Sequence, residues 1–197
     1  MKTLCVADTV VKELLDLVGG GPAIADVELL LSCGDLPPEY LTALRARYDA
    51  PLLYVLGNHD LRYQTAPPVG CTSVDRRLII LGGKKVVGFS GSRWYNGNIN
   101  QYTEEQMGGF IRKLRFTLWR NKGLDVVLTH APPRHIHDAE DLCHRGFRSF
   151  RGFIDKYRPR HFLHGHIHAL FDSEEERRTS LDLTQVINCY GYHLLEI

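Results

Sequence analysis

The residues of this 197-residue chain that could do chemistry are carboxylates, an amide and imidazoles, and each group directly follows a short apolar run. Apolar runs of this length predict β-strands. In α/β sheets, ligands bind beyond the carboxyl ends of the strands, so five separate loops are expected to bring these groups to one place. The polar motifs are Asp8, Gly34-Asp35, Gly57-Asn58-His59-Asp60, Thr129-His130 and Gly165-His166-Ile167-His168.

A metal ion is the partner that this mixture of side chains indicates. Carboxylate, amide and imidazole donors suit borderline divalent ions, with Mn²⁺ expected first and iron or Zn²⁺ after it, better than they suit Mg²⁺. The set holds no thiolate, which argues against a structural zinc site and for an open, catalytic one. Gly34, Gly57 and Gly165 each stand beside a candidate ligand and would let the backbone approach the metal closely. The candidate metal ligands are Asp8, Asp35, Asn58, His130, His166 and His168.

The elements that must position these groups alternate between strand and helix in the first third of the chain, which is typical of βαβ units. Apolar residues recur at a helical period just after Asp8, and Pro37-Pro38 marks the start of another helix. The predicted strands are 2–7, 27–32 and 51–56, and the predicted helices are 10–18 and 38–48.

The rest of the chain predicts antiparallel strands as well, and therefore mixed sheets. Two short apolar runs are separated by Gly82-Gly83, and Thr103 with Gln106 resembles a capping box at a helix start. The further predicted elements are strands 78–81, 84–90, 125–128 and 161–163, helices 104–120 and 150–157, and a closing hairpin of 186–189 and 193–197 around Gly191.

Length and composition predict one domain spanning residues 1–197, because a chain of this size can bury one sizeable core. A formal net charge of +1 provides no global field that would attract nucleic acid or a membrane. The five cysteines form no Cys-x-x-Cys pair, and a strand-like run begins at Lys2 without a cleavable apolar leader, so we expect a reducing, cytoplasmic location. No apolar run approaches the roughly 20 residues of a membrane helix.

Taken in order, the motifs from Asp8 to His168 resemble the calcineurin-like metallophosphoesterase superfamily, in its small, single-domain prokaryotic form. The resemblance implies an α/β fold, a four-layer αββα sandwich in which two mixed β-sheets pack face to face with helices outside. It also implies a hydrolase that attacks phosphodiesters or phosphomonoesters with a metal-activated water at a dinuclear centre.

The resemblance further implies a role for each matching residue. Asp35 would bridge two metal ions. His59 would face the phosphate and assist the leaving group, and Asp60 would orient the imidazole of His59. The other ligands of the second metal site would be Asn58, His130 and His166, and those of the first would be Asp8 and His168.

The first motif departs from the family pattern, which is Asp-x-His, because this chain has Asp8-Thr9-Val10. Valine cannot bind a metal ion. Three consequences are open: a weak first site formed by Asp8, Asp35 and His168, another side chain in the place of the histidine, or a single firmly held ion. We expect the first, since Asp8 is retained after its strand.

The expected substrate is a phosphorylated small molecule or a nucleotide. Two other interpretations are open: a nuclease, suggested by the arginine-rich and phenylalanine-rich segment 145–160, and a non-catalytic metal-binding scaffold, suggested by Val10. We prefer to interpret segment 145–160 as an amphipathic helix with buried aromatics, because acidic runs such as Glu174-Glu175-Glu176 balance the net charge. A homodimer is left open, since family members of this size are often dimers. The candidate substrate contacts are Arg93, His135, His144 and Arg145.

Overall fold

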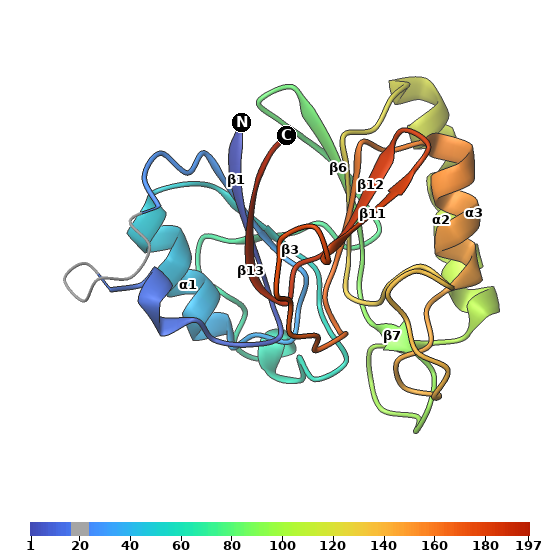
Figure 1. Cartoon of the computed structure of the whole chain (residues 1–197), viewed down its shortest axis with the longest axis horizontal. Helices are drawn as coiled ribbons and strands as arrows, with labels where there is room; N and C mark the ends of the chain where they lie inside the picture. Colours follow the sequence, from blue (N-terminus) through green and yellow to red (C-terminus); the bar gives the residue numbers. More distant parts are fainter. Residues whose placement is uncertain (17–23) are drawn as a thin grey trace.

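Two β-sheets packed face to face form the centre of the structure, with helices outside each of them (Figure 1). The structure is a computed structural model that describes residues 1–16 and 24–197. This arrangement confirms the expected α/β architecture of two mixed sheets covered by helices. The two chain ends lie side by side, and the N–H of Ile197 donates to the carbonyl of Met1.

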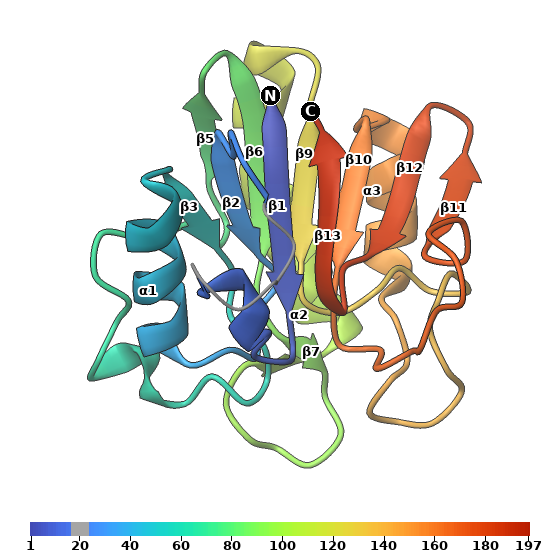
Figure 2. The same cartoon turned by 60° about the vertical axis from the view of Figure 1, so that its left-hand side comes forward.

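The first sheet contains the three strands of the βαβ units predicted at the start of the chain (Figure 2). Parallel pairs join β1 to β2 and β2 to β3, and β13 closes the sheet antiparallel to β1. Its strand order is β13 (Gly191–Glu196), β1 (Lys2–Ala7), β2 (Leu29–Ser32), β3 (Leu52–Tyr54) and β4 (Thr72–Ser73).

The second sheet has parallel strands at its centre and an antiparallel strand at each edge. The hairpin predicted around Gly82-Gly83 is confirmed as β5 and β6. The strand order is β11 (Arg178–Leu181), β12 (Thr184–Asn188), β10 (His161–His164), β9 (Val126–Thr129), β6 (Lys84–Phe89) and β5 (Leu78–Leu81). A separate short pair joins β7 (Ser92–Arg93) to β8 (Gln101–Tyr102).

Both faces of each central strand are buried, which explains why the sequences of these strands are continuous apolar runs. In β1, Cys5 and Ala7 face the core between the sheets, whereas Leu4 and Val6 face the core under α1 (Pro38–Tyr48). In β9, Val127 faces a third core under α2 and α3. Three apolar layers therefore separate four layers of secondary structure.

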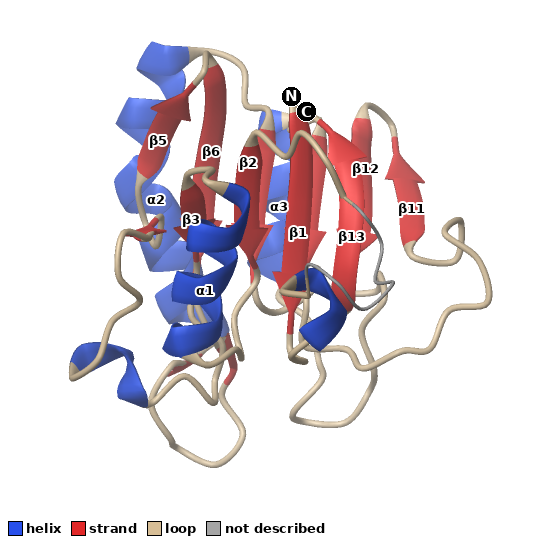
Figure 3. Cartoon of the chain, turned by 90° about the vertical axis from the view of Figure 1, so that its left-hand side faces the viewer, coloured by secondary structure: helices blue, strands red, loops and turns tan. Residues whose placement is uncertain are grey.

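Two of the three α-helices of the described residues begin where local sequence rules predict, whereas the third begins at Arg148, before its predicted start at Phe150. Helix α1 has a proline at its first position, and α2 (Glu104–Asn121) begins with a complete capping box between Thr103 and Gln106. Helix α3 (Arg148–Tyr157) buries Phe150, Phe153 and Ile154 against the second sheet. Figure 3 shows α1 over one sheet and α2 and α3 behind the other. None of the described helices is long and apolar enough to span a membrane.

Two predicted elements are wrong. The predicted helix 10–18 is only a 3-10 turn, Lys12–Leu14, over its described part, and positions 17 and 18 lie outside the described residues. The neighbouring β-branched residues Val10 and Val11 disfavour a longer helix. The predicted hairpin around Gly191 does not form, because β12 belongs to the second sheet and β13 to the first. The side chain of Asn188 bonds to the N–H of Tyr190 at this crossing between sheets.

Candidate metal centre

The candidate ligands lie in loops that leave the carboxyl ends of strands in both sheets, as predicted. Asp8 follows β1 and Asp35 follows β2, whereas His130 follows β9 in the second sheet. Asp8 ties the two sheets together here, because both of its carboxylate oxygens accept from the N–H of His166, after β10, at 3.0 Å. Within the first sheet, the N–H of Asp8 also donates to the carbonyl of Gly34. The centre thus lies at one end of the interface between the sheets.

The backbone at this centre adopts conformations that side chains usually avoid. Asp8, Asp35 and His166 all have positive φ, at 67°, 56° and 68°. Non-glycine residues rarely adopt this region, and such strain concentrates at functional sites. A Cβ at Gly57 would lie 2.0 Å from Oδ1 of Asp35, and one at Gly165 would lie 2.5 Å from Oδ2 of Asp8. At these two positions the backbone lies against a candidate ligand carboxylate, which leaves no space for a side chain.

Three ligand-bearing side chains converge in the buried part of the centre. One ligand atom each of Asp35, His130 and His166 lies within 4.8 Å of the other two. Nε2 of His130 is 3.3 Å from Oδ2 of Asp35 and 3.1 Å from Oδ1 of Asn58. The amide orientation of Asn58 is set by its Nδ2, which donates to the hydroxyl of Tyr95.

This donor set fits a divalent cation. Nδ1 of His130 lies 2.8 Å from the carbonyl oxygen of Cys33 and must donate its proton there. Its Nε2 therefore faces two oxygen acceptors, those of Asp35 and Asn58, and presents a lone pair to them when the ring is neutral. Three acceptors facing one another need a proton or a cation between them.

The pKa shifts of the candidate ligands also indicate that this cluster favours a positive charge. Burial opposes a charge on His130, but the carboxylate of Asp35 outweighs it and raises the pKa of His130 to about 9. Burial likewise opposes the charge on Asp35, yet the nearby His130 lowers its pKa to about 2. Burial, with the charge of His130, lowers the pKa of His166 to about 3, so this imidazole is neutral and can act as a ligand.

The first site is less complete. Nε2 of His168 is 3.5 Å from Oδ1 of Asp8, and the ring of His168 stacks on Tyr190 with centroids 4.8 Å apart. The side chain of Val10 is 40% exposed and carries no ligand atom. Among the described residues, no histidine, cysteine or carboxylate, Asp35 included, forms with Asp8 and His168 a group whose ligand atoms all lie within 4.8 Å of one another.

The calcineurin-like phosphoesterase family matches residues 1–170, a span that includes every candidate metal ligand. The chain belongs to this family. The family implies metal-dependent hydrolysis of phosphoesters, and Asp35, His130 and His166 form a group that could hold a metal ion for that chemistry. No protein of curated function matches the sequence.

Solved structures share the fold at low sequence identity. The protein TT1561 of Thermus thermophilus is 15% identical with a TM-score of 0.67, and the match covers 98% of this chain and 93% of that one. A putative 5′-nucleotidase from Staphylococcus aureus is 13% identical with a TM-score of 0.61, and this chain spans 50% of its length. These likenesses show the calcineurin-like fold and nothing finer.

His59 and Asp60 occupy the loop expected from the family motif, but their contacts differ from those expected. The imidazole of His59 is exposed at the rim, and its backbone N–H donates to Oδ1 of Asp35 at 2.8 Å. The carboxylate of Asp60 accepts from the N–H groups of Asp35 and Gly57, both at 2.8 Å. No hydrogen bond among the described residues joins Asp60 to the imidazole of His59. Asp60 therefore fixes the two ligand loops, and burial raises its pKa to about 6.

Of the four candidate substrate contacts, only His144 lies against a metal ligand, with its ring centroid 5.3 Å from that of His166. Arg93 bonds to Glu104, which also accepts from the backbone at the start of α3, so its charge is engaged in a structural link. Arg145 donates to the carbonyl of Glu140, and His135 is exposed.

Two residues beside the metal ligands were missed by sequence reasoning. Tyr95 bonds to Asn58, and the carbonyl of Cys143 lies 2.8 Å from Nε2 of His166. Tyr95 follows Arg93, the last residue of β7. A tyrosine just beyond the end of a strand was the sequence feature that could have indicated this contact. Cys143 contacts His166 through its backbone, which no sequence motif reveals.

Proposed function

We propose that this protein hydrolyses phosphoesters of small molecules or nucleotides at a centre of two unequal metal sites. The observation that carries the proposal is the convergence of Asp35, Asn58, His130 and His166 around lone pairs that face one another. In this proposal these four residues hold the firmly bound ion, and Asp8, Asp35 and His168 hold a weaker one. Mn²⁺ is the proposed ion, because the ligands combine oxygen and imidazole donors without a thiolate.

The ions would lower the pKa of a water molecule and polarise the phosphoryl oxygens. The protein supplies the remaining functions. The backbone N–H of His59 and the carbonyl of Cys33 hold Asp35 and His130 in place. The exposed imidazole of His59 would donate a proton to the leaving-group oxygen, which is the role that its position at the rim favours.

A hollow of about 220 Å³ beside Asp35 and His59 supports a small substrate. Its other walls include Leu36, Pro37 and Tyr63, so an apolar part of the leaving group could pack there. Sites for drug-sized ligands usually enclose about 300–1,000 Å³, and this hollow is smaller. We therefore propose a compact phosphorylated molecule in preference to a polymer.

The nuclease alternative gains no support from α3. Phe150 and Phe153 of this helix are buried, and Arg151 pairs with Asp155 on the outside. Salt-dependent binding of DNA or RNA would restore the nuclease alternative. The cytoplasmic location and the homodimer remain predictions.

Initial rates on a chromogenic phosphodiester and a chromogenic phosphomonoester, before and after Mn²⁺ is added to chelator-treated protein, test the proposal. We expect turnover only with metal, and loss of at least about 100-fold in the Asp35→Asn variant, because a metal ligand is removed. Asp49→Asn, at the exposed end of α1, is the matched control and should retain activity. Absence of turnover on both substrates with metal bound would favour the non-catalytic scaffold.

A further inference from the structure

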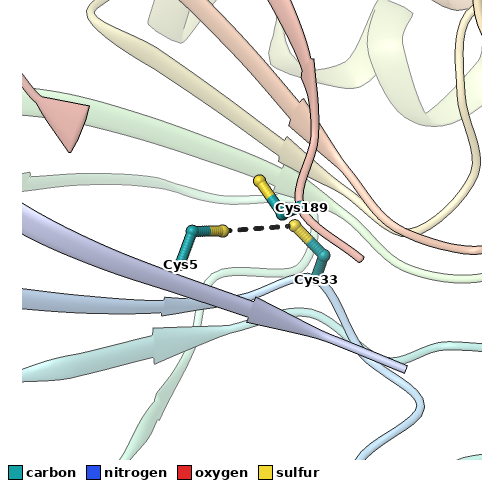
Figure 4. Close-up of side chains that lie close together, drawn as sticks. All are labelled: Cys5, Cys33 and Cys189. Carbon is teal, nitrogen blue, oxygen red and sulfur yellow. Dashed lines mark hydrogen bonds between the residues drawn. The ribbon is translucent and has the colours of Figure 1, made fainter. Parts of the chain in front are cut away.

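Three cysteine side chains meet in the core, apart from the ligands of the hydrolytic centre (Figure 4). Cys5 lies in β1, Cys33 follows β2 and Cys189 follows β12, so the cluster joins the two sheets. The three sulfur atoms all lie within 4.8 Å of one another, and Sγ of Cys5 is 3.6 Å from Sγ of Cys33. Each side chain is completely buried.

The three cysteines belong to the hydrophobic core between the two sheets. Ala7, Leu31, Val55 and Leu163 belong to the same core between the sheets. No histidine or carboxylate of the described residues joins this group of potential ligands. A bound ion would therefore be held by sulfur alone, and sulfur-only sites select soft ions such as Cu(I) or Zn²⁺.

Coordination number separates these two ions. Cysteine binds metal ions as the thiolate, so each bound thiol releases its proton. Two or three sulfur ligands are sufficient for Cu(I), and this cluster offers three. Structural Zn²⁺ almost always takes a fourth ligand, which this cluster does not offer among the described residues.

We propose that Cys5, Cys33 and Cys189 bind one soft monovalent metal ion, of the Cu(I) type, through sulfur atoms that are not ligands of the hydrolytic centre. Three sulfur–hydrogen bonds break and three sulfur–metal bonds form, the three protons pass to solvent, and no oxidation state changes. The site does not depend on the proposed hydrolytic function, since none of its sulfur atoms belongs to the Asp35, His130 and His166 cluster.

Because the sulfurs are fully buried, the ion must be supplied while the chain folds. The full-length protein is refolded anaerobically in a thiol reductant with chelator-buffered Cu(I) as the probe, and the metal retained after gel filtration is measured. We expect about one Cu(I) per chain and a sulfur-only first shell in the X-ray absorption spectrum. His166→Ala, which removes a ligand of the hydrolytic centre, should retain the ion.

Cys189→Ala and Cys189→Ser should lose at least about nine tenths of the Cu(I), whereas Cys71→Ala, a cysteine outside the cluster, should retain it. Circular dichroism reports whether each variant folds. If the Cys189 variants do not fold, the X-ray absorption spectrum of the wild-type protein alone tests the proposal. No retained Cu(I) in the wild type, nitrogen or oxygen ligands in the spectrum, or equal retention by a folded Cys189 variant would overturn the proposal. A Cys5–Cys33 disulfide formed in place of metal binding would also overturn it.

Discussion

His130 shows how single residues define the centre, since one ring nitrogen is bound to the carbonyl of Cys33 and the other faces Asp35 and Asn58. The hydrogen bond to the backbone carbonyl holds a proton on Nδ1 and fixes the ring, so the imidazole is already oriented before a metal ion binds. Asn58 is fixed in turn by Tyr95. The residues that hold the ligands in place are therefore as much part of the centre as the ligands themselves.

Replacing Tyr95 by phenylalanine removes the hydroxyl that accepts from Nδ2 of Asn58. Freed from this bond, the Asn58 amide can turn, and we expect the Mn²⁺ affinity to fall about 10-fold or more. Titration with Mn²⁺ measures the change. Tyr157→Phe, on α3, is the matched control, and equal affinities in the two variants would contradict the role given to Tyr95.

A chain of imidazoles beneath the His166 loop predicts how stability depends on pH. Nε2 of His137 lies 2.9 Å from the hydroxyl of Thr179, and its Nδ1 lies 2.8 Å from Nε2 of His164, whose Nδ1 faces the carbonyl of Gly165. Burial lowers the pKa of both histidines below the usual 6.5. Both are therefore neutral in the folded protein.

Protonation of these histidines favours the unfolded chain, because its imidazoles keep the higher, ordinary pKa. Their contribution to stability is thus complete above pH 6.5 and is lost as the pH falls below it. We expect the free energy of unfolding to decrease there by at most about 1.4 kcal/mol per pH unit for each histidine. Urea unfolding on both sides of that pH measures this, and His164→Gln should show a shallower dependence. An unchanged slope in His164→Gln would contradict the prediction.

At the scale of elements, the strand ends and the turns after them position the ligands, and glycines make the turns close enough. Gly57→Ala places a Cβ 2.0 Å from Oδ1 of Asp35, so we expect Mn²⁺ affinity to fall at least about 10-fold. Gly152→Ala, in α3, meets nothing within 4 Å and should increase stability by about 0.5–1 kcal/mol. Metal titration and urea unfolding of both variants test the contrast, and retained affinity in Gly57→Ala would refute it.

The sequence predicted best the strand ends that precede polar motifs and the starts of α1 and α2. The polar motifs after β2 and β9, and the capping box of α2, depend on local rules, and all were confirmed. The hairpin at Gly191 was wrong because partner choice is not local: β13 pairs with β1, almost the whole chain away. The contacts of Arg93 and Asp60 likewise depend on distant loops.

For the whole molecule, metal binding should stabilise the fold, because the ligands come from both sheets. At Mn²⁺ concentrations about 100 times the dissociation constant, the expected gain is about 2.7 kcal/mol. Thermal unfolding of chelator-treated protein, with and without Mn²⁺, measures the gain. Asp35→Asn should lose most of it, and an equal gain in that variant would place the stabilising ion elsewhere.

The unequal occupancy of the two sites is the central claim, and anomalous diffraction from crystals grown with limiting Mn²⁺ tests it most directly. We predict a strong peak among Asp35, Asn58, His130 and His166, and a weaker peak beside Asp8 and His168 that grows as more Mn²⁺ is supplied. Two peaks of equal height at limiting Mn²⁺, or no peak among the first four residues, would contradict the account.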